Sequence, residues 1–277
     1  MDSRADKSSG VPMSGSAVTT ASPANDIATV IAVGVLAATV AVLSHETLGH
    51  GAGCLSIGGH VTLLTSTLFR CSRYAPIADA GGPLGNLVAG CVAIALLRLT
   101  TPSSTGRLFL VLVSALNLFW FSAQIGFESA TATPDDWNWL LQMRPALCRP
   151  VGVAIGIVGY LLVRRWITAI NRGPGGPEAN AVLLAYAAAA TAAFIAGLMW
   201  RPEPLRGALQ GFLTLGLAPL GLLKIAGATR AAAAGSRAAV PRSWPWLAVC
   251  IVLFGLFLFI QARGVGGRAG LPVSTFP

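Results

Sequence analysis

Long apolar runs separated by short polar segments make up most of the chain after residue 26. Seven runs have about the 20 residues that a membrane-crossing helix needs, and they cover 27–57, 79–99, 106–127, 150–170, 179–200, 207–227 and 244–262. The runs do not alternate between apolar and polar residues, as the strands of a membrane β-barrel do. Gly216, Pro219 and Gly221 interrupt the sixth run. The pattern predicts an all-α, polytopic membrane bundle of six to seven transmembrane helices.

The composition agrees with a lipid environment. Hydrophobic residues make up 54% of the chain and charged residues only 10%, against about 25% charged residues in soluble domains. We therefore expect a multi-pass integral protein of the cell (inner) membrane, with the lipid bilayer as its surroundings. The net charge of +9 is almost all arginine, placed singly or in pairs between apolar runs. This is where lipid headgroups attract basic residues, so no nucleic-acid partner is expected.

Three ionisable residues stand together after the first apolar run, in His45-Glu46-Thr47-Leu48-Gly49-His50. An ionisable residue at membrane depth is costly and indicates a functional site. Neutral imidazoles bind zinc well, and a catalytic zinc site uses three protein ligands. A neighbouring carboxylate can take a proton from water. We expect His45 and His50 to bind Zn²⁺ and Glu46 to be the catalytic general base; a hydrogen-bonded contact between helices is the alternative use of these side chains.

The spacing of the two histidines is unusual. Zinc-binding helices commonly carry His-Glu-x-x-His, with the histidines four residues apart, whereas His45 and His50 are five apart. In a regular α-helix, five residues give roughly 140° of angular separation, which is too wide for two ligands of one ion. A π-bulge adds one residue to a turn and would realign them. The spacing therefore predicts a bulge at or near Gly49, whose missing side chain gives the backbone freedom to form one.

This motif resembles two families of zinc peptidases. Its six residues are similar to the HExxGH signature of dipeptidyl peptidase III, a soluble family. The wider arrangement resembles the site-2 protease family of intramembrane metalloproteases, in which a His-Glu motif on one membrane helix precedes a Gly-Pro-x-x-Asn element and then a carboxylate ligand. Here Gly82-Pro83-Leu84-Gly85-Asn86 opens the second run and Asp135-Asp136 follow the third. The resemblance covers roughly residues 27–140 and implies a zinc-dependent intramembrane endopeptidase.

The resemblance also implies a third metal ligand after the third run. The sequence there reads Pro134-Asp135-Asp136-Trp137 in place of the family's Asn-x-x-Pro and Leu-Asp-Gly elements. We expect Asp136 to be the ligand, with Asp135 and then Glu128 as alternatives. Asp135 and Asp136 could instead cap a helix that starts at Trp137, because aspartate is a good helix cap.

Three further polar residues have open interpretations. The resemblance implies that Asn86 binds substrate or stabilises an oxyanion, although the Gly-Gly-Pro before it could simply begin a helix. Asn117 and Gln124 lie seven residues apart on the third run and share a helical face. They could line a polar cavity or hydrogen-bond to neighbouring helices. The remaining histidine, His60, is expected in a loop.

The cysteines and arginines bear on the compartment. All five cysteines are interpreted as free apolar residues, although Cys54 and Cys71 flank the first loop and could form a disulfide in an oxidising compartment. A cytoplasmic N-terminus would place eleven basic residues on the cytoplasmic side and eight on the other, which the positive-inside rule weakly favours. The resemblance to site-2 proteases implies a cytosolic site and hence an external N-terminus.

The predicted organisation has four parts. Residues 1–25 form a disordered N-terminal tail, 26–145 a membrane-embedded metalloprotease-like core, 146–265 additional transmembrane helices, and 266–277 a C-terminal tail. The expected activity is cleavage of membrane-embedded or membrane-proximal segments of a membrane protein substrate. Two alternatives stay open: a catalytically divergent or inactive membrane metal-binding protein, and a transporter whose Pro- and Gly-broken helices form a site at the midplane.

Overall fold

A computed structural model describes residues 24–133, 135–173, 175–230 and 238–266. Within these residues, seven helical segments are long and apolar enough to cross a membrane. The predicted all-α membrane bundle is thus confirmed, and each predicted span differs from the observed one by no more than five residues at either end. The observed spans are Ile27–Ser56, Pro76–Leu99, Ser104–Thr131, Pro145–Arg172, Ala179–Leu198, Pro204–Gly227 and Trp244–Ala262. The predicted tails lie almost wholly outside the described residues.

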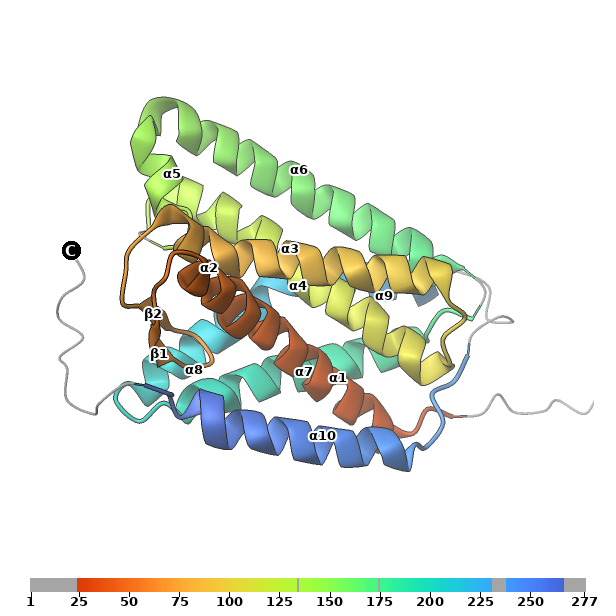
Figure 1. Cartoon of the computed structure of the whole chain (residues 1–277). Helices are drawn as coiled ribbons and strands as arrows, with labels where there is room; N and C mark the ends of the chain where they lie inside the picture. The colour runs from red at the N-terminus through yellow and green to blue at the C-terminus, as the bar shows by residue number, and fades with distance from the viewer. Residues whose placement is uncertain (1–23, 134, 174, 231–237, 267–277) are drawn as a thin grey trace, which may run out of the picture.

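Each span runs in the opposite direction to the one before it (Figure 1). The first combines α1 (Ile27–Val42), a π-helix η1 (Leu43–His50) and α2 (Gly51–Ser56). The next are α3 (Pro76–Leu99), α4 (Ser104–Thr131), α6 (Pro145–Arg172) and α7 (Ala179–Leu198). The sixth combines α8 (Pro204–Phe212), η2 (Leu213–Leu217), η3 (Ala218–Leu220) and α9 (Gly221–Arg230), and the seventh α10 (Trp244–Phe257) and η5 (Leu258–Ala262).

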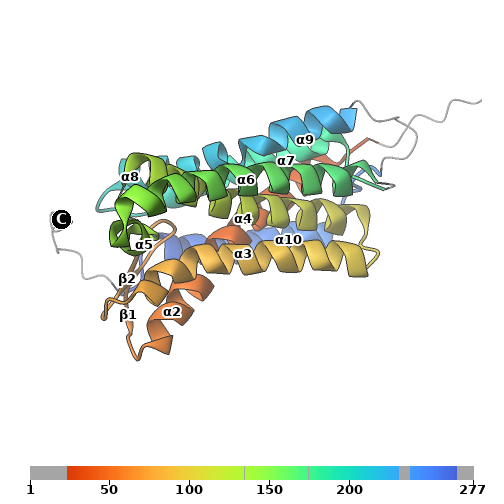
Figure 2. The ribbon, with the colours of Figure 1, turned by 90° about the horizontal axis from the view of Figure 1, so that it is seen from above.

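Helix α4 is the centre of the bundle. It packs against α1, α3 and α6, and Figure 2 shows it between α3 and α6. Its inward residues Leu108, Leu112, Leu116 and Phe119 are fully buried. Helices α6 and α10 keep most of their apolar side chains exposed, as expected for spans that face lipid. The predicted division at residue 145 stays a prediction, although α6 and α7 pack closely on α4 and α1.

One end of the bundle, here named the site end, carries the loops 57–75, 132–144 and 199–203 and residues 263–266 (Figure 1). The loop 57–75 contains a β-hairpin of β1 (Val61–Leu64) and β2 (Phe69–Cys71). The loop 199–203 contains neither helix nor strand. A short helix α5 (Asn138–Met143) lies in the second loop. The hairpin is tied to the last span, because Leu64 pairs with Val265 and Gln261 donates to the Thr65 carbonyl.

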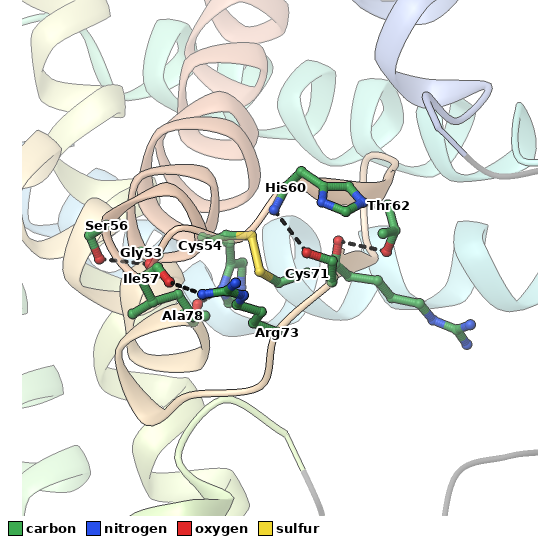
Figure 3. The surroundings of a disulfide bond; sticks show 12 residues. Gly53, Cys54, Ser56, Ile57, His60, Thr62, Cys71, Arg73 and Ala78 are labelled. Carbon is green, nitrogen blue, oxygen red and sulfur yellow. Dashed lines mark hydrogen bonds between the residues drawn. A yellow bond between two sulfur atoms is a disulfide. The ribbon is translucent and has the colours of Figure 1, made fainter.

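Cys54 and Cys71 form a disulfide that joins α2 to β2 (Figure 3). The interpretation of these two cysteines as free was therefore wrong. The hairpin brings Cys71 back over the first span, to a Cα–Cα distance of 5.7 Å from Cys54. The other three cysteines, Cys91, Cys148 and Cys250, are free.

The second span begins earlier than its glycine-rich element suggested. Pro76 is at its N-terminus, where proline is well tolerated, so Gly82 and Pro83 lie inside α3 and do not begin it. The glycines serve a close crossing with η1. A Cβ on Gly49 would lie 2.3 Å from the Gly81 carbonyl oxygen, and one on Gly85 would lie 2.1 Å from the Ser44 carbonyl oxygen. This crossing brings α3 against the histidine motif.

Candidate metal centre

The π-helix η1 contains the whole histidine motif. Its wider turns place residues five apart on one face, and the rings of His45 and His50 lie 4.8 Å apart between centroids. The predicted π-bulge is confirmed, and it extends over Leu43–His50. Gly49 has no positive φ. Its lack of a side chain is needed for the close approach to α3, not for unusual backbone torsion.

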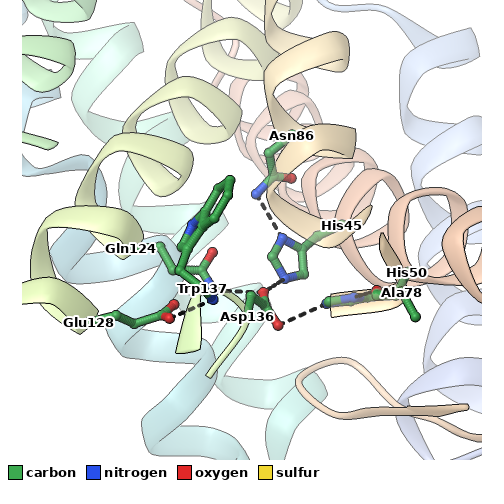
Figure 4. Close-up of polar contacts among 8 residues, drawn as sticks. All are labelled: His45, His50, Ala78, Asn86, Gln124, Glu128, Asp136 and Trp137. Atoms are coloured by element: carbon green, nitrogen blue, oxygen red, sulfur yellow. Dashed lines mark hydrogen bonds and ion pairs between the residues drawn. The ribbon is translucent and has the colours of Figure 1, made fainter. Parts of the chain in front are cut away.

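Asp136 completes a group of three donors that could hold a metal ion (Figure 4). His45 Nε2 lies 3.1 Å from Asp136 Oδ2, and His50 Nε2 lies 3.4 Å from Asp136 Oδ1. All three residues are buried. Asp136 comes from the loop after α4, so the group joins parts of the chain about 90 residues apart in sequence.

Asp135 and Asp136 have different environments, and neither caps helix α5. Asp135 is exposed and does not belong to the three-donor group. Helix α5 has Trp137 at its N-cap and no side-chain cap hydrogen bond. The interpretation of Asp135 and Asp136 as helix caps was therefore wrong.

The spacing of the donors is compatible with one metal ion, because one ligand atom each from His45, His50 and Asp136 lies within 4.8 Å of the other two. Gly82 of α3 faces the same point. A Cβ there would lie 2.3 Å from His50 Nε2 and 2.7 Å from His45 Nε2. The space beside both nitrogens exists because residue 82 has no side chain.

His50 gives the most direct reason to expect a cation. Its Nδ1 lies 2.7 Å from the Ala78 carbonyl oxygen, which can only accept, so Nδ1 must carry the hydrogen. The Nε2 of a neutral ring then presents its lone pair to the Asp136 carboxylate. Two acceptors that face each other repel, and a proton or a metal ion between them removes the repulsion. The donor set therefore fits a divalent metal ion.

The second nitrogen of His45 is also occupied. Its Nδ1 lies 3.0 Å from Asn86 Nδ2, so both histidines are oriented through Nδ1. A metal-ligating histidine usually donates from that nitrogen, as His50 does to the Ala78 carbonyl. Aromatic rings fix the same two side chains. Trp120 of α4 stacks on His45 with centroids 4.2 Å apart, and Phe69 of the hairpin stacks on His50 at 5.1 Å.

Helix α4 holds the loop that carries Asp136. Gln124 Nε2 donates to Asp136 Oδ2 at 2.7 Å, and Glu128 Oε2 accepts from the Trp137 backbone N–H at 2.9 Å. Burial acts to raise the pKa of Asp136, but without a metal ion a protonated His50 and hydrogen bonds from both histidines outweigh it and lower the pKa below its usual range. A bound metal ion would take the place of those protons.

Glu46 lies within η1 beside the three donors. Its side chain is buried, and Oε2 has no hydrogen-bond partner among the described residues. An unpaired buried carboxylate oxygen is costly, and its nearest charged neighbours include His50 and Asp136. No hydrogen bond among the described residues explains why a carboxylate is buried at this position.

The other candidate residues have different positions. Glu128 supports the Asp136 loop and is not in the metal group. Asn117 donates to the Val113 carbonyl of its own helix, whereas Gln124, on the same face, reaches Asp136. His60 is exposed and lies between α2 and β1, as expected for a loop residue, and its backbone N–H donates to Ser72 Oγ (Figure 3).

Several contact residues were not predicted from the sequence: Phe69, Gly82, Trp120 and the supporting role of Glu128. A usable signal existed for the last of these. Gln124 and Glu128 are spaced four residues apart, which places both on one face of an apolar span just before the aspartates. Nothing in the sequence pointed to Phe69, because its position depends on the hairpin.

In comparisons with known proteins, no family model matches the chain, and no curated protein or solved structure matches it. The chemistry of this protein is therefore inferred from the geometry of the metal centre.

Proposed function

We propose that this integral membrane protein is a zinc-dependent endopeptidase of the site-2 protease type, located in the cell (inner) membrane. One observation carries the proposal. The π-helix turns two histidines spaced five apart toward one aspartate, with an unpaired glutamate beside them. A purely structural contact does not need that combination of residues.

The roles follow from the positions of the side chains. His45, His50 and Asp136 would hold the ion, which would supply Lewis acidity and make water more acidic. Glu46 accepts the proton that water loses as its oxygen attacks the scissile carbonyl carbon. Glu46 then returns that proton to the amide nitrogen that leaves as an amine. Water is thus divided between the two products, and Glu46 ends in its starting state.

The depth of the site supports a membrane-embedded or membrane-proximal protein segment as substrate. The histidines are buried between α3, α4 and the hairpin, near the end of the first span. A protein segment that is in the membrane, or close to its surface, is already at the depth of the histidines. The substrate-binding role of Asn86, implied by the resemblance, stays a prediction.

Metal content tests the first half of the proposal. Protein purified in detergent should contain about one zinc per chain, and His45→Ala and His50→Ala should lose it, as measured by elemental mass spectrometry. His60→Ala is the matched control, since His60 is exposed and outside the group. Equal zinc in all four proteins would contradict the proposal.

Catalysis needs a separate test. Glu46→Gln should keep zinc and abolish the membrane-protein fragments that appear when the wild-type protein is expressed, as measured by quantitative proteomics of peptide termini. Glu203→Gln is the control, because Glu203 lies at the same end of the bundle, forms an ion pair with Arg206 and is not in the metal group. If Glu46→Gln produces the same fragments as the wild type, the protein is a metal-binding protein without protease activity.

A further inference from the structure

The two histidines differ in what faces their Nδ1 atoms. Behind His50 stands a backbone carbonyl, which fixes the hydrogen on Nδ1. Behind His45 stands the carboxamide of Asn86, which has both a donor and an acceptor. Oxygen and nitrogen of such an amide exchange places when it turns over, and structures seldom distinguish the two arrangements directly.

The present arrangement of Asn86 fits His45 without metal. Nδ2 faces His45 Nδ1 at 3.0 Å, so Nδ1 accepts and the hydrogen of a neutral ring lies on Nε2. Nε2 can then donate to Asp136 Oδ2 at 3.1 Å. This arrangement leaves Asn86 Oδ1 buried and without a hydrogen-bond partner among the described residues, which costs free energy.

Metal binding at Nε2 requires the opposite tautomer, with the hydrogen on Nδ1. Turning the amide over places Oδ1 against Nδ1, so that the unpaired oxygen gains a donor. We infer that Asn86 is a positioning residue that selects the metal-binding tautomer of His45 by turning over its carboxamide. The inference rests on the proposed metal site but not on proteolysis, and it differs from a role of Asn86 in contacting substrate.

Zinc affinity of the detergent-purified protein tests this inference. Each variant is stripped with a chelator and titrated with zinc against a chromophoric competitor. Asn86→Leu, which removes the acceptor, should weaken binding about 10–100-fold. Asn86→Asp, which offers only acceptor oxygens to Nδ1–H, should bind zinc as tightly as the wild type or more tightly. Asn117→Leu makes the same change at a buried asparagine outside the site and should have no effect.

Two results would overturn the inference: Asn86→Leu that binds zinc like the wild type, or Asn86→Asp that binds as weakly as Asn86→Leu. If Asn86→Leu does not purify as a monodisperse protein, Asn86→Ala also lacks an acceptor and replaces it. Failure of the proposed function looks different, because then the wild type itself binds no zinc.

The disulfide supports a second, independent inference about orientation. Cys54 lies four residues after His50 on the first span, and its bond to Cys71 ties the hairpin to the site end. Disulfides persist in oxidising compartments and are rare in the cytosol. A disulfide at this end indicates that the metal centre lies on the extracytoplasmic side of the membrane.

The basic residues of the described part show only a slight excess in the same direction. Eight lie at the end opposite the site, namely Arg98, Arg107, Arg164, Arg165, Arg172, Lys224, Arg230 and Arg242. Seven lie at the site end, namely Arg70, Arg73, Arg144, Arg149, Arg201, Arg206 and Arg263. The positive-inside rule assigns the richer end to the cytoplasm, but it is the disulfide that carries the inference. We infer that the metal group faces the oxidising, extracytoplasmic side of the membrane, in contrast to the cytosolic site that the resemblance to site-2 proteases implies.

Labelling of single cysteines tests the orientation. In a background with Cys91→Ala, Cys148→Ala and Cys250→Ala, Thr133→Cys probes an exposed position at the site end and Thr101→Cys one at the opposite end. A membrane-impermeant maleimide on intact cells should label Thr133→Cys strongly and Thr101→Cys only after permeabilisation. The background itself should be labelled only after reduction. The reverse labelling pattern, or a background labelled without reduction, would overturn the inference.

Discussion

Three spans of this protein contain π-helix, the first, the sixth and the end of the seventh at Leu258–Ala262. The first and the sixth differ in what the distortion does. The first contains the π-helix Leu43–His50, and the sixth contains a π-helix, a 3₁₀ turn and a kink at Pro219. In the sixth span, the exposed backbone groups are taken up by tyrosines. Tyr186 donates to the Gly216 carbonyl, and Tyr160 accepts from the Gly221 N–H at 2.7 Å. The break is therefore compensated by side chains of α7 and α6.

The first span uses its distortion to place side chains. His45 and His50 converge on Asp136, and Glu46 remains unpaired. Lipid cannot satisfy a free backbone group, so both distortions need compensation, but only one leads to a cluster of metal donors. An irregular membrane helix is therefore evidence of a site only when its side chains, and not just its backbone, are brought together.

The largest effect is expected at Gly82, where the space for the ion depends on a missing side chain. Gly82→Ala would place a Cβ 2.3 Å from His50 Nε2 and 2.7 Å from His45 Nε2. The new methyl group would push the Nε2 atoms of both histidines away from the position of the ion. We therefore expect the zinc affinity to fall at least about 100-fold below that of the wild type. Zinc content and chelator competition measure this.

Gly51→Ala is the matched control for Gly82→Ala. Gly51 directly follows the π-helix, and a Cβ there meets nothing within 4 Å, so zinc binding should stay at the wild-type level. Retention of zinc by Gly82→Ala would show that the ion does not lie where the three donors point.

A smaller effect is expected at Gln124, which donates to the Asp136 oxygen that faces His45. Gln124→Leu leaves the aspartate without this support, and loss of such an outer hydrogen bond typically costs about 10–100-fold in metal affinity. Asn117 lies seven residues before Gln124 on the same face of α4. Asn117→Leu removes only a hydrogen bond within that helix. Equal zinc affinities for these two variants would contradict the proposed role of α4 in holding the ligand loop.

Much of the bundle could be predicted from the sequence because lipid imposes a simple rule on apolar runs. The seven spans follow from run length alone, including the interrupted sixth span. The π-helix could also be predicted, since His45 and His50, five positions apart, can converge only if the helix is widened. Asp136 was predicted as a ligand because it follows the third run, as a carboxylate ligand does in the family that the sequence resembles. Helix geometry did not identify it.

The unpredicted features depend on contacts between distant segments. The hairpin, with Phe69 on His50, forms in a loop whose residues show no clear strand pattern, and the disulfide depends on that hairpin. The start of α3 at Pro76 was missed because Gly82-Pro83 reads locally as a helix start. In the folded protein these glycines are required by the crossing with η1, where Gly49 and Gly81 leave no room for side chains. Local sequence rules do not contain that information.

The smallest effect is expected in the sixth span and completes the contrast with the first. Tyr160→Phe removes the acceptor of the Gly221 N–H, and Tyr186→Phe removes the donor to the Gly216 carbonyl. Each loss should destabilise the protein by about 1 kcal/mol or less and lower its melting temperature in detergent by roughly 2–4 °C. Zinc affinity should not change, because neither tyrosine contacts the metal centre. If either variant lost zinc along with its small loss of stability, the two irregular spans would be coupled, and the sixth would have to be counted as part of the site.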